Sequence, residues 1–197
     1  MSTVSTLESP YHHGSLRKAL IDAGLRALEG SEEHDLSLRE LAREVGVSPA
    51  AVYRHFPGKD ALLAALGHEG LVMLGTAQRA AYEAAGGGAR GFTETGRAYV
   101  RFALAHPALF RLVFAHGDPK PRQSDKSDPA SRLLHEATVE LTGSDGPAAE
   151  RLALQAWAIG HGIAMLMLDK RLPADDALIE RLIDTGSLFP LAQDPDA

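Results

Sequence analysis

The sequence predicts an all-α protein with an N-terminal three-helix helix-turn-helix domain and a C-terminal helical domain. Apolar residues recur three and four positions apart along almost the whole chain, which is the helical period. No alternation of Val, Ile or Thr is long enough for a strand. Gly and Pro occur at short intervals and mark the ends of the helical stretches. The length of 197 residues suits one compact unit or a small module fused to a larger one.

The first three predicted helices are short and closely spaced. Residues 15–29 form the first, which a left-handed Gly30 would stop. The second opens with Ser37-Leu38-Arg39-Glu40, a capping box in which the Ser hydroxyl and the Glu carboxylate each satisfy a backbone N–H. It ends at Gly46. The third runs from the N-cap and proline of Ser48-Pro49 to Phe56.

Six further helices are predicted beyond Pro57-Gly58. The first begins at Lys59 and runs toward Tyr82, before a flexible joint at Gly86-Gly87-Gly88. The others cover residues 92–105, 108–114, 131–141, 147–168 and 174–186. Residues 117–129 are polar and proline-rich, which predicts a mobile surface loop. We therefore expect a first domain over residues 1–58 and a second over 59–197.

Composition excludes several classes of protein. The absence of cysteine removes disulfides, thiolate metal sites and cysteine nucleophiles. A net charge of −6 excludes a polycationic binder. The N-terminus lacks the apolar core of a signal peptide, and no stretch reaches the ~18 uncharged apolar residues of a membrane span. We expect a cytoplasmic protein with no membrane partner.

Residues 36–56 carry the most informative pattern. Two short helices joined by a tight Gly46-Val47-Ser48 turn match the helix-turn-helix unit. An ordinary helical hairpin would explain the apolar positions equally well, but not the charges. Residues 45–59 contain no Asp or Glu, and the short third helix and its flank carry the donors Tyr53, Arg54, His55 and Lys59. A small donor-rich helix of this kind fits the major groove of DNA.

The charge balance indicates how such binding would work. Residues 1–66 contain 7 Lys or Arg against 9 Asp or Glu, so affinity depends on locally placed donors rather than on a bulk positive field. A second acid-free stretch, residues 9–21, adds His12, His13, Arg17 and Lys18. Helix N-termini there and at Ser37 can also offer backbone N–H groups to phosphates.

Residues 36–66, LSLRELAREVGVSPAAVYRHFPGKDALLAAL, resemble the DNA-binding domain of the tetracycline-repressor (TetR) family. Residues 11–17 resemble the opening of one branch of that family. This branch has a "WHG" C-terminal domain, named for a Trp and a His-Gly pair, and residues 106–111 and 157–162 match it. The resemblance covers nearly the whole chain and is most specific before Leu66.

The resemblance implies a homodimeric transcription regulator, a repressor released from its DNA operator by a small-molecule effector, with no cofactor. The helix over residues 49–56 would read base edges, and the C-terminal domain would bind the effector and dimerise. By position, the family contacts phosphates at Ser37, Tyr53 and Lys59, and bases at Pro49, Ala50, Arg54 and His55.

Residues 152–168 carry no formal charge, which predicts a buried helix. A membrane span is excluded because the stretch is short and contains Gln155 and His161. Trp157, His161, Ala164 and Leu168 share one face, and Ile159, Ile163 and Leu166 lie roughly opposite. One face would pack within the subunit and the other against a second subunit. We expect a homodimer through residues 147–186, with the choice of face left open.

A small-molecule cavity is predicted beside this helix. Phe110 and Phe114 lie four apart on a neighbouring segment. We expect them to enclose a cavity with Trp157 and His161, with Met165 at its edge. The alternative is that Trp157 and the two phenylalanines interdigitate as a solid core.

Other chemistry finds no support in the sequence. The nine histidines form no metal-binding pair four apart with a third ligand nearby. GxSxG and GxxxxGK[ST] are absent, and the GxGxxG match at residues 86–91 follows a predicted helix rather than the strand that a dinucleotide-binding site requires. We expect no catalytic residue and no metal. The competing hypotheses are a ligand-binding or interaction module that retains the fold without reading DNA, and then an enzyme. Effector identity, operator sequence and the choice between repressor and activator are not encoded in readable form.

Overall fold

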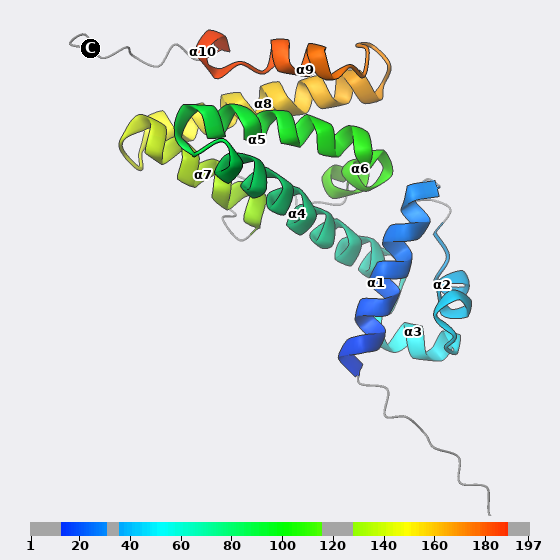
Figure 1. Ribbon diagram of the computed structural model, residues 1–197. Coiled ribbons are helices and arrows are strands. Elements are labelled where there is room, and N and C mark those ends of the chain that lie inside the picture. Colours follow the sequence, from blue (N-terminus) through cyan, green and yellow to red (C-terminus); the bar gives the residue numbers. More distant parts are fainter. Residues whose placement is uncertain (1–12, 31–35, 116–127, 189–197) are drawn as a thin grey trace, which may run out of the picture. The chain divides into compact units, whose positions relative to one another are not determined.

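The computed structural model describes residues 13–30, 36–115 and 128–188, and within these ranges all regular structure is helical (Figure 1). The predicted all-α class is confirmed. The elements are α1 (His13–Gly30), α2 (Leu38–Val45), α3 (Pro49–His55), α4 (Lys59–Ala84), α5 (Gly88–Ala105), α6 (Pro107–Ala115), α7 (Pro129–Thr142), α8 (Pro147–Leu168), α9 (Asp176–Leu182) and α10 (Thr185–Leu188).

The chain divides into two compact units, Met1–Leu66 and Gly67–Ala197. Helix α4 runs through this boundary, so its first turns belong to the N-terminal unit and the rest to the second. The core of the N-terminal unit collects fully buried side chains from three helices and one cap: Leu20, Val52, Phe56, Leu62 and Leu66. A Cβ on Gly24 would lie 2.9 Å from Leu66, so glycine permits this close approach of α1 to α4.

The turn between α2 and α3 has the predicted chemistry. Gly46 adopts the left-handed conformation, with φ of 75°. The N–H of Val47 donates to the carbonyl of Ala42 at 2.8 Å, which satisfies one of the last carbonyls of α2. Ser48 then caps α3, since its hydroxyl accepts from the N–H of Ala51 at 3.3 Å. These local bonds fix the direction in which α3 leaves α2.

The predicted capping box at α2 is wrong, because neither the Ser37 hydroxyl nor the Glu40 carboxylate makes a capping hydrogen bond. Ser37 stands at the N-cap with extended backbone angles, but its side chain makes no capping hydrogen bond. The backbone carbonyl of Ser37 still accepts from the N–H of Leu41 at 3.0 Å, so the helix starts at the expected place without the hydroxyl. The Ser37 hydroxyl therefore takes no part in capping α2.

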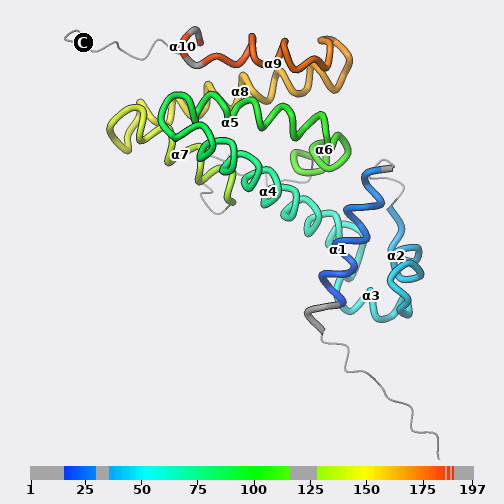
Figure 2. The backbone as a smooth tube through the Cα atoms, viewed as in Figure 1, coloured from blue at the N-terminus to red at the C-terminus, as the bar shows by residue number. Residues whose placement is uncertain are grey.

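The second unit is built around α5, which packs against α6, α7, α8, α9 and α10. The largest interface joins α5 to α8, and the two helices run side by side in Figure 2. The part of α4 in this unit lies close to its neighbours at two glycines. A Cβ on Gly70 would come within 2.7 Å of Val113, and one on Gly75 within 2.6 Å of Pro129.

The joint between α4 and α5 differs from the sequence prediction. The three glycines 86–88 form a tight turn with positive φ, and Gly88 already begins α5. The hydroxyl of Tyr82 holds this turn, because it accepts from the N–H of Gly88 at 3.2 Å and donates to Glu140. Burial and this bond to Glu140 raise the pKa of Tyr82. The predicted loop 117–129 lies outside the described residues except for its end, where Asp128 caps α7.

The helix predicted over residues 174–186 is instead two helices, α9 and α10. The break falls at Ile183, whose side chain is buried. Arg97 on α5 donates from Nε to the carbonyl of Ile183 and from Nη2 to the carbonyl of Glu180, both at 3.1 Å. A guanidinium from another helix thus satisfies the carbonyls at the end of α9, which allows the helix to stop there.

Replacing Asp176 by Asn is expected to destabilise the protein at neutral pH but not at strongly acidic pH. Arg101 donates to both oxygens of this exposed carboxylate, at 2.6 and 3.0 Å, and these hydrogen bonds lower the pKa of Asp176. A lowered folded-state pKa contributes stability above the ordinary Asp pKa of about 3.9, and this is lost as pH falls through the lowered value. Urea unfolding of wild type and Asp176→Asn at pH 7 and pH 3 measures the difference, which should shrink in acid.

Candidate DNA-binding surface and ligand cavity

Helix α3 presents one face to its own unit and another to solvent. Ala51 and Val52 are buried. Pro49, Ala50, Tyr53 and Arg54 are all exposed, so four of the seven residues predicted to contact DNA share the outer face. The Tyr53 side chain is 45% exposed, which is unusual for so large a residue. This outer face carries a phenol and a guanidinium as donors and no carboxylate.

The other three predicted DNA-contact residues are half-buried. His55 ends α3, Lys59 begins α4 four residues later, and Ser37 precedes α2. His55 and Lys59 each already interact with other groups of the chain. Because Lys59 follows α3 across only Phe56, Pro57 and Gly58, its ammonium extends the run of donors beyond the end of the helix.

Each of the three basic residues of α1 has a partner within the N-terminal unit. Lys18 binds Asp22 at 2.8 Å, and Arg26 binds Glu44 at 2.8 Å. Arg17 instead lies over the ring of Phe56, with 5.2 Å between its guanidinium carbon and the ring centroid. Sequence reasoning singled out Arg17 but not this contact, which places its charge beside the end of α3. His12 and the side chain of His13 lie outside the described residues.

In the second unit, four of the five predicted cavity residues form one aromatic cluster. The ring of Phe110 is fully buried, with its centroid 4.8 Å from that of Phe114 and 5.7 Å from that of His161. Trp157 joins through His161, at 5.9 Å. Tyr99 on α5, which sequence reasoning missed, contacts Phe110 edge to face at 5.4 Å. Its hydroxyl lies 3.0 Å from Nδ1 of His161.

A cavity of about 410 Å³ lies beside this cluster, lined mainly by α4, α5, α7 and α8. Phe114 and Trp157 belong to its wall, as expected. Phe110, His161 and Met165 are not lining residues, which corrects the expected wall. Tyr99 lines the cavity and contacts both Phe110 and His161, so its ring takes their place. Phe110 and His161 thus pack against each other, as in the solid-core alternative, whereas Trp157 and Phe114 line the cavity.

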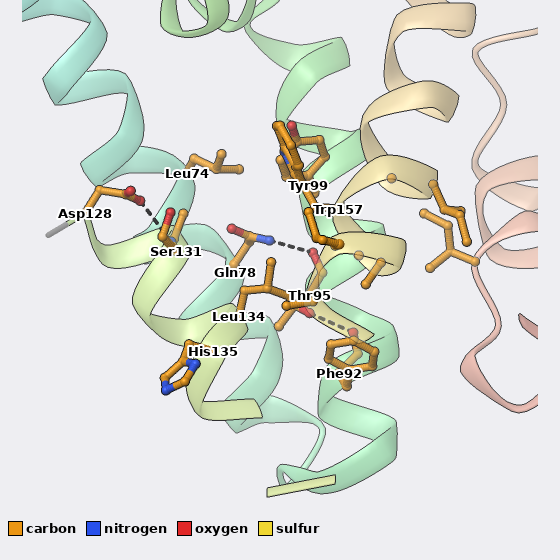
Figure 3. Close-up of a pocket in the computed structure, with 18 of the residues that line it drawn as sticks. Leu74, Gln78, Phe92, Thr95, Tyr99, Asp128, Ser131, Leu134, His135 and Trp157 are labelled. Atoms are coloured by element: carbon orange, nitrogen blue, oxygen red, sulfur yellow. Dashed lines mark hydrogen bonds between the residues drawn. The ribbon is translucent and has the colours of Figure 1, made fainter. Parts of the chain in front are cut away.

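Few polar groups face this cavity. Figure 3 shows Gln78 on α4 and Ser131 on α7 opposite Thr95 on α5 and Trp157 on α8. The amide nitrogen of Gln78 donates to the carbonyl of Thr95 at 3.2 Å. Asp128 accepts from the N–H of Ser131 at 2.9 Å. An apolar wall with a small number of placed polar groups is the usual form of a small-molecule site. Sequence periodicity gave no sign of Gln78.

Metal binding and membrane insertion are two other roles that helical proteins of this size can serve. Within the described ranges, no group of three His, Asp or Glu residues is placed to hold a metal ion. Helix α8 is long and apolar enough to cross a membrane by length and composition, a test that core helices of soluble proteins also pass. Here α8 packs against α5 and α7, but only 28% of its apolar window is buried in the described chain, so the predicted buried helix is buried on one side alone.

A helix-turn-helix unit with an exposed donor face, joined to a helical unit with an apolar cavity, defines a helix-turn-helix regulator. Residues 20–66 match the family model described as bacterial regulatory proteins, tetR family, and residues 92–186 match the model of the tetracyclin repressor-like C-terminal domain. The chain belongs to the TetR family of transcription regulators.

Individual relatives are similar to this chain in sequence or in fold. A structure of a protein of unknown function from Rhodococcus sp. RHA1 is 38% identical, with a TM-score of 0.75, over 94% of this chain and 100% of that one. A tetR-family transcriptional regulator from Streptomyces coelicolor shares the fold, with 22% identity and a TM-score of 0.57 over 89% and 80% of the two chains. An uncharacterized HTH-type transcriptional regulator of Haemophilus influenzae is 33% identical over 49% of this chain. The match spans 48% of that relative's length.

Proposed function

We propose that the protein is a cytoplasmic, homodimeric repressor that binds an inverted-repeat operator and releases it when a small organic molecule enters the cavity. Residues 1–58 would bind DNA, and residues 59–197 would dimerise and bind the effector. The observation that carries the proposal is the outer face of α3, which is exposed, rich in donors and free of carboxylates. A surface of this kind suits the edges of bases in the major groove.

The residues of this surface divide into two roles. Arg54 is an exposed guanidinium on α3, and a guanidinium can donate two hydrogen bonds to guanine. We assign base contacts to Pro49, Ala50, Arg54 and His55. Tyr53, Lys59 and Ser37 would bind phosphates, and Ser37 suits this role because its hydroxyl does not cap α2.

Arg54→Ala is expected to relax the preference for particular base pairs, at a cost of about 1–3 kcal/mol on the operator. Lys59→Ala and Tyr53→Phe should instead weaken binding to all sequences. Lys59→Ala should also reduce the slope of the salt dependence by roughly one unit for each phosphate that the variant no longer binds. Titrations on operator and random DNA at several salt concentrations measure both effects. Equal losses of affinity on both DNAs for all three variants would remove the base-reading role from Arg54.

Dimerisation is supported by the outer face of α8. Its exposed residues include Ala158 and Leu166, and the space beside Gly162 is open. Leu154 is also exposed, about a third of a turn round the helix from Leu166, where it lines the cavity. Leu154 and Leu166 are among the few large apolar side chains that the described part of the chain leaves exposed. Ile159 and Ile163 are only half-buried flanks of this face. A two-fold partner would cover the apolar surface, as in other helical bundles.

Effector control is supported by the position of α4. The same helix starts at Lys59, beside the recognition helix, and carries the cavity residues Leu71, Leu74 and Gln78. We propose that α4 can take up more than one position and that only some of them suit DNA binding. A molecule that binds more tightly to one of these positions increases the population of that conformation. Such coupling is typically ~1–3 kcal/mol. Wild-type protein on operator DNA, titrated with candidate effectors, tests this release directly.

Selection of bound DNA from a random pool tests the proposal as a whole. We expect an inverted repeat whose half-sites lie about one helical turn, or a multiple of it, apart. Enrichment of a single half-site would support sequence-specific DNA binding and contradict the proposed homodimer. If the pool shows no enrichment, the chain is better explained as a ligand-binding or interaction module that retains the fold.

A further inference from the structure

Gln78 on α4 is a buried amide with only one of its two polar ends satisfied. The side chain is 8% exposed and lines the cavity. Its Nε2 donates to the carbonyl of Thr95 at 3.2 Å. Its Oε1 is shielded from solvent and accepts no hydrogen bond within the described residues. Because the Thr95 carbonyl can only accept, the nitrogen must face it, and the amide cannot be reversed.

An acceptor that is buried without a donor is unfavourable, and native proteins contain few of them. In Figure 3 the nitrogen of Gln78 points toward Thr95, and the oxygen points away from it, toward the side of α7 where Ser131 lies. Gln78 therefore brings an unsatisfied acceptor to the lining of a mainly apolar cavity. A donor on a bound molecule would satisfy it without displacing an existing bond.

Two other polar groups of the lining are already engaged. The hydroxyl of Thr95 donates to the carbonyl of Phe92 at 2.7 Å. The hydroxyl of Tyr99 is hydrogen-bonded to His161. These side chains present satisfied groups or ring faces to a ligand, so Gln78 is distinguished from them by its unused oxygen.

The charge and shape of the lining restrict the ligand further. Aromatic rings of Phe92, Tyr99, Phe114 and Trp157 contribute to the wall. Among the described lining residues, Asp128 and Glu150 carry carboxylates, and none is Lys or Arg. An anion entering the cavity would lose hydration and meet the carboxylates of Asp128 and Glu150, with His135 as the one described lining side chain that can carry a positive charge.

We infer that the cavity takes a neutral, largely apolar ring compound that donates an O–H or N–H to Oε1 of Gln78. This inference rests on the proposed use of the cavity as the effector site and specifies the chemistry that the site selects. Gln78 is then the residue that distinguishes a hydrogen-bond donor from an apolar molecule of the same shape.

Three probes with a common biphenyl body test the inference on the full-length protein. They are 4-phenylphenol, its methyl ether 4-methoxybiphenyl, and biphenyl-4-carboxylate. Trp157 is the single tryptophan of the chain and lines the cavity, so its fluorescence reports binding there, with calorimetry as a second measure. We expect the phenol to bind about tenfold more tightly than the ether, which cannot donate, and the carboxylate to bind weakest.

Gln78→Met should abolish the preference for the phenol over the ether, since it keeps the chain length and removes the acceptor. Thr95→Val is the matched control, because it removes a hydroxyl from the same wall that is already satisfied. It should keep the preference. Ligand-free Gln78→Met loses both the unsatisfied oxygen and the hydrogen bond from Nε2 to Thr95, so its melting temperature should stay close to that of wild type. If the Gln78→Met variant does not fold, the same binding test is repeated with Gln78→Leu, whose side chain is branched.

An unchanged preference in the Gln78 variants, or a carboxylate that binds more tightly than the phenol, would overturn the inference. Equal binding of all three probes to wild type would also overturn it, while leaving the cavity as a ligand site. If no probe changes the fluorescence or the melting temperature, ring compounds are not its ligands and the inference falls. The proposed repressor function fails separately, by the absence of an enriched operator in the selection from random DNA.

Discussion

Phe110→Ala is expected to lower the free energy of unfolding by about 3–5 kcal/mol, because it leaves a hole at the centre of the aromatic cluster. The ring is 0% exposed and contacts Tyr99, Phe114 and His161. The surrounding rings belong to three different helices, which limits how far they can close the gap. Urea unfolding followed by circular dichroism measures the loss of stability.

Trp157→Ala provides the comparison, since Trp157 is half-buried and borders a space that is already empty. It should cost less stability than Phe110→Ala and should alter the affinity for the biphenyl probes, measured by calorimetry. DNA binding at temperatures well below melting should stay near wild type. Equal losses of stability in the two variants would show that Trp157 is a core residue and that its side of the cavity is filled.

If the proposed homodimer forms through the outer face of α8, Leu166→Glu is expected to convert it to monomers at micromolar concentration. Leu166 is 45% exposed on the outer face of α8, so the charge is tolerated in an isolated subunit. In a two-fold interface formed by this face, each subunit would bury an unpaired carboxylate, at a cost of at least about 3 kcal/mol per charge. Sedimentation of wild type and variant measures the change, and affinity for an inverted repeat should fall with it.

Ala89→Glu is the matched control for this substitution. Ala89 is exposed in the first turn of α5, where a carboxylate is favourable. It should leave the oligomeric state unchanged. Wild-type protein that sediments as a monomer would end the dimer hypothesis, and a Leu166→Glu protein that stays dimeric would move the interface to another face. Ile159 and Ile163 are less suitable because they are half-buried within the subunit.

The parts of the fold that the sequence predicts well are those decided by neighbouring residues. Gly46 and Ser48-Pro49 place the end of α2 and the start of α3 through bonds that span a few residues. Helix α8 has the predicted bounds because Pro147 begins it and its apolar stretch ends at Leu168. The outward position of Tyr53 and Arg54 likewise follows from the helical period once Val52 is known to be buried.

The parts that the sequence does not predict depend on partners far apart in the chain. The break after α9 is satisfied by Arg97, which precedes it by more than eighty residues. The wall of the cavity includes Gln78 and Tyr99, whose spacing relative to α8 follows no local period. Periodicity predicted that His161 and Trp157 share a face of α8, but it did not predict how deeply each side chain is buried. Their burial depends on how α5 packs against that helix.

Helix α4 continues from one unit into the other without a loop, so the residues that it gives to each unit share one helical phase. Each added residue of an α-helix advances it by 1.5 Å and rotates everything beyond it by about 100°. One residue inserted between Leu66 and Leu71 would therefore change the angle between the face of α4 that packs in the first unit and the face that lines the cavity. An insertion of seven residues nearly restores that angle, so the number of residues in α4, rather than their identity at each position, sets the angle between its two faces.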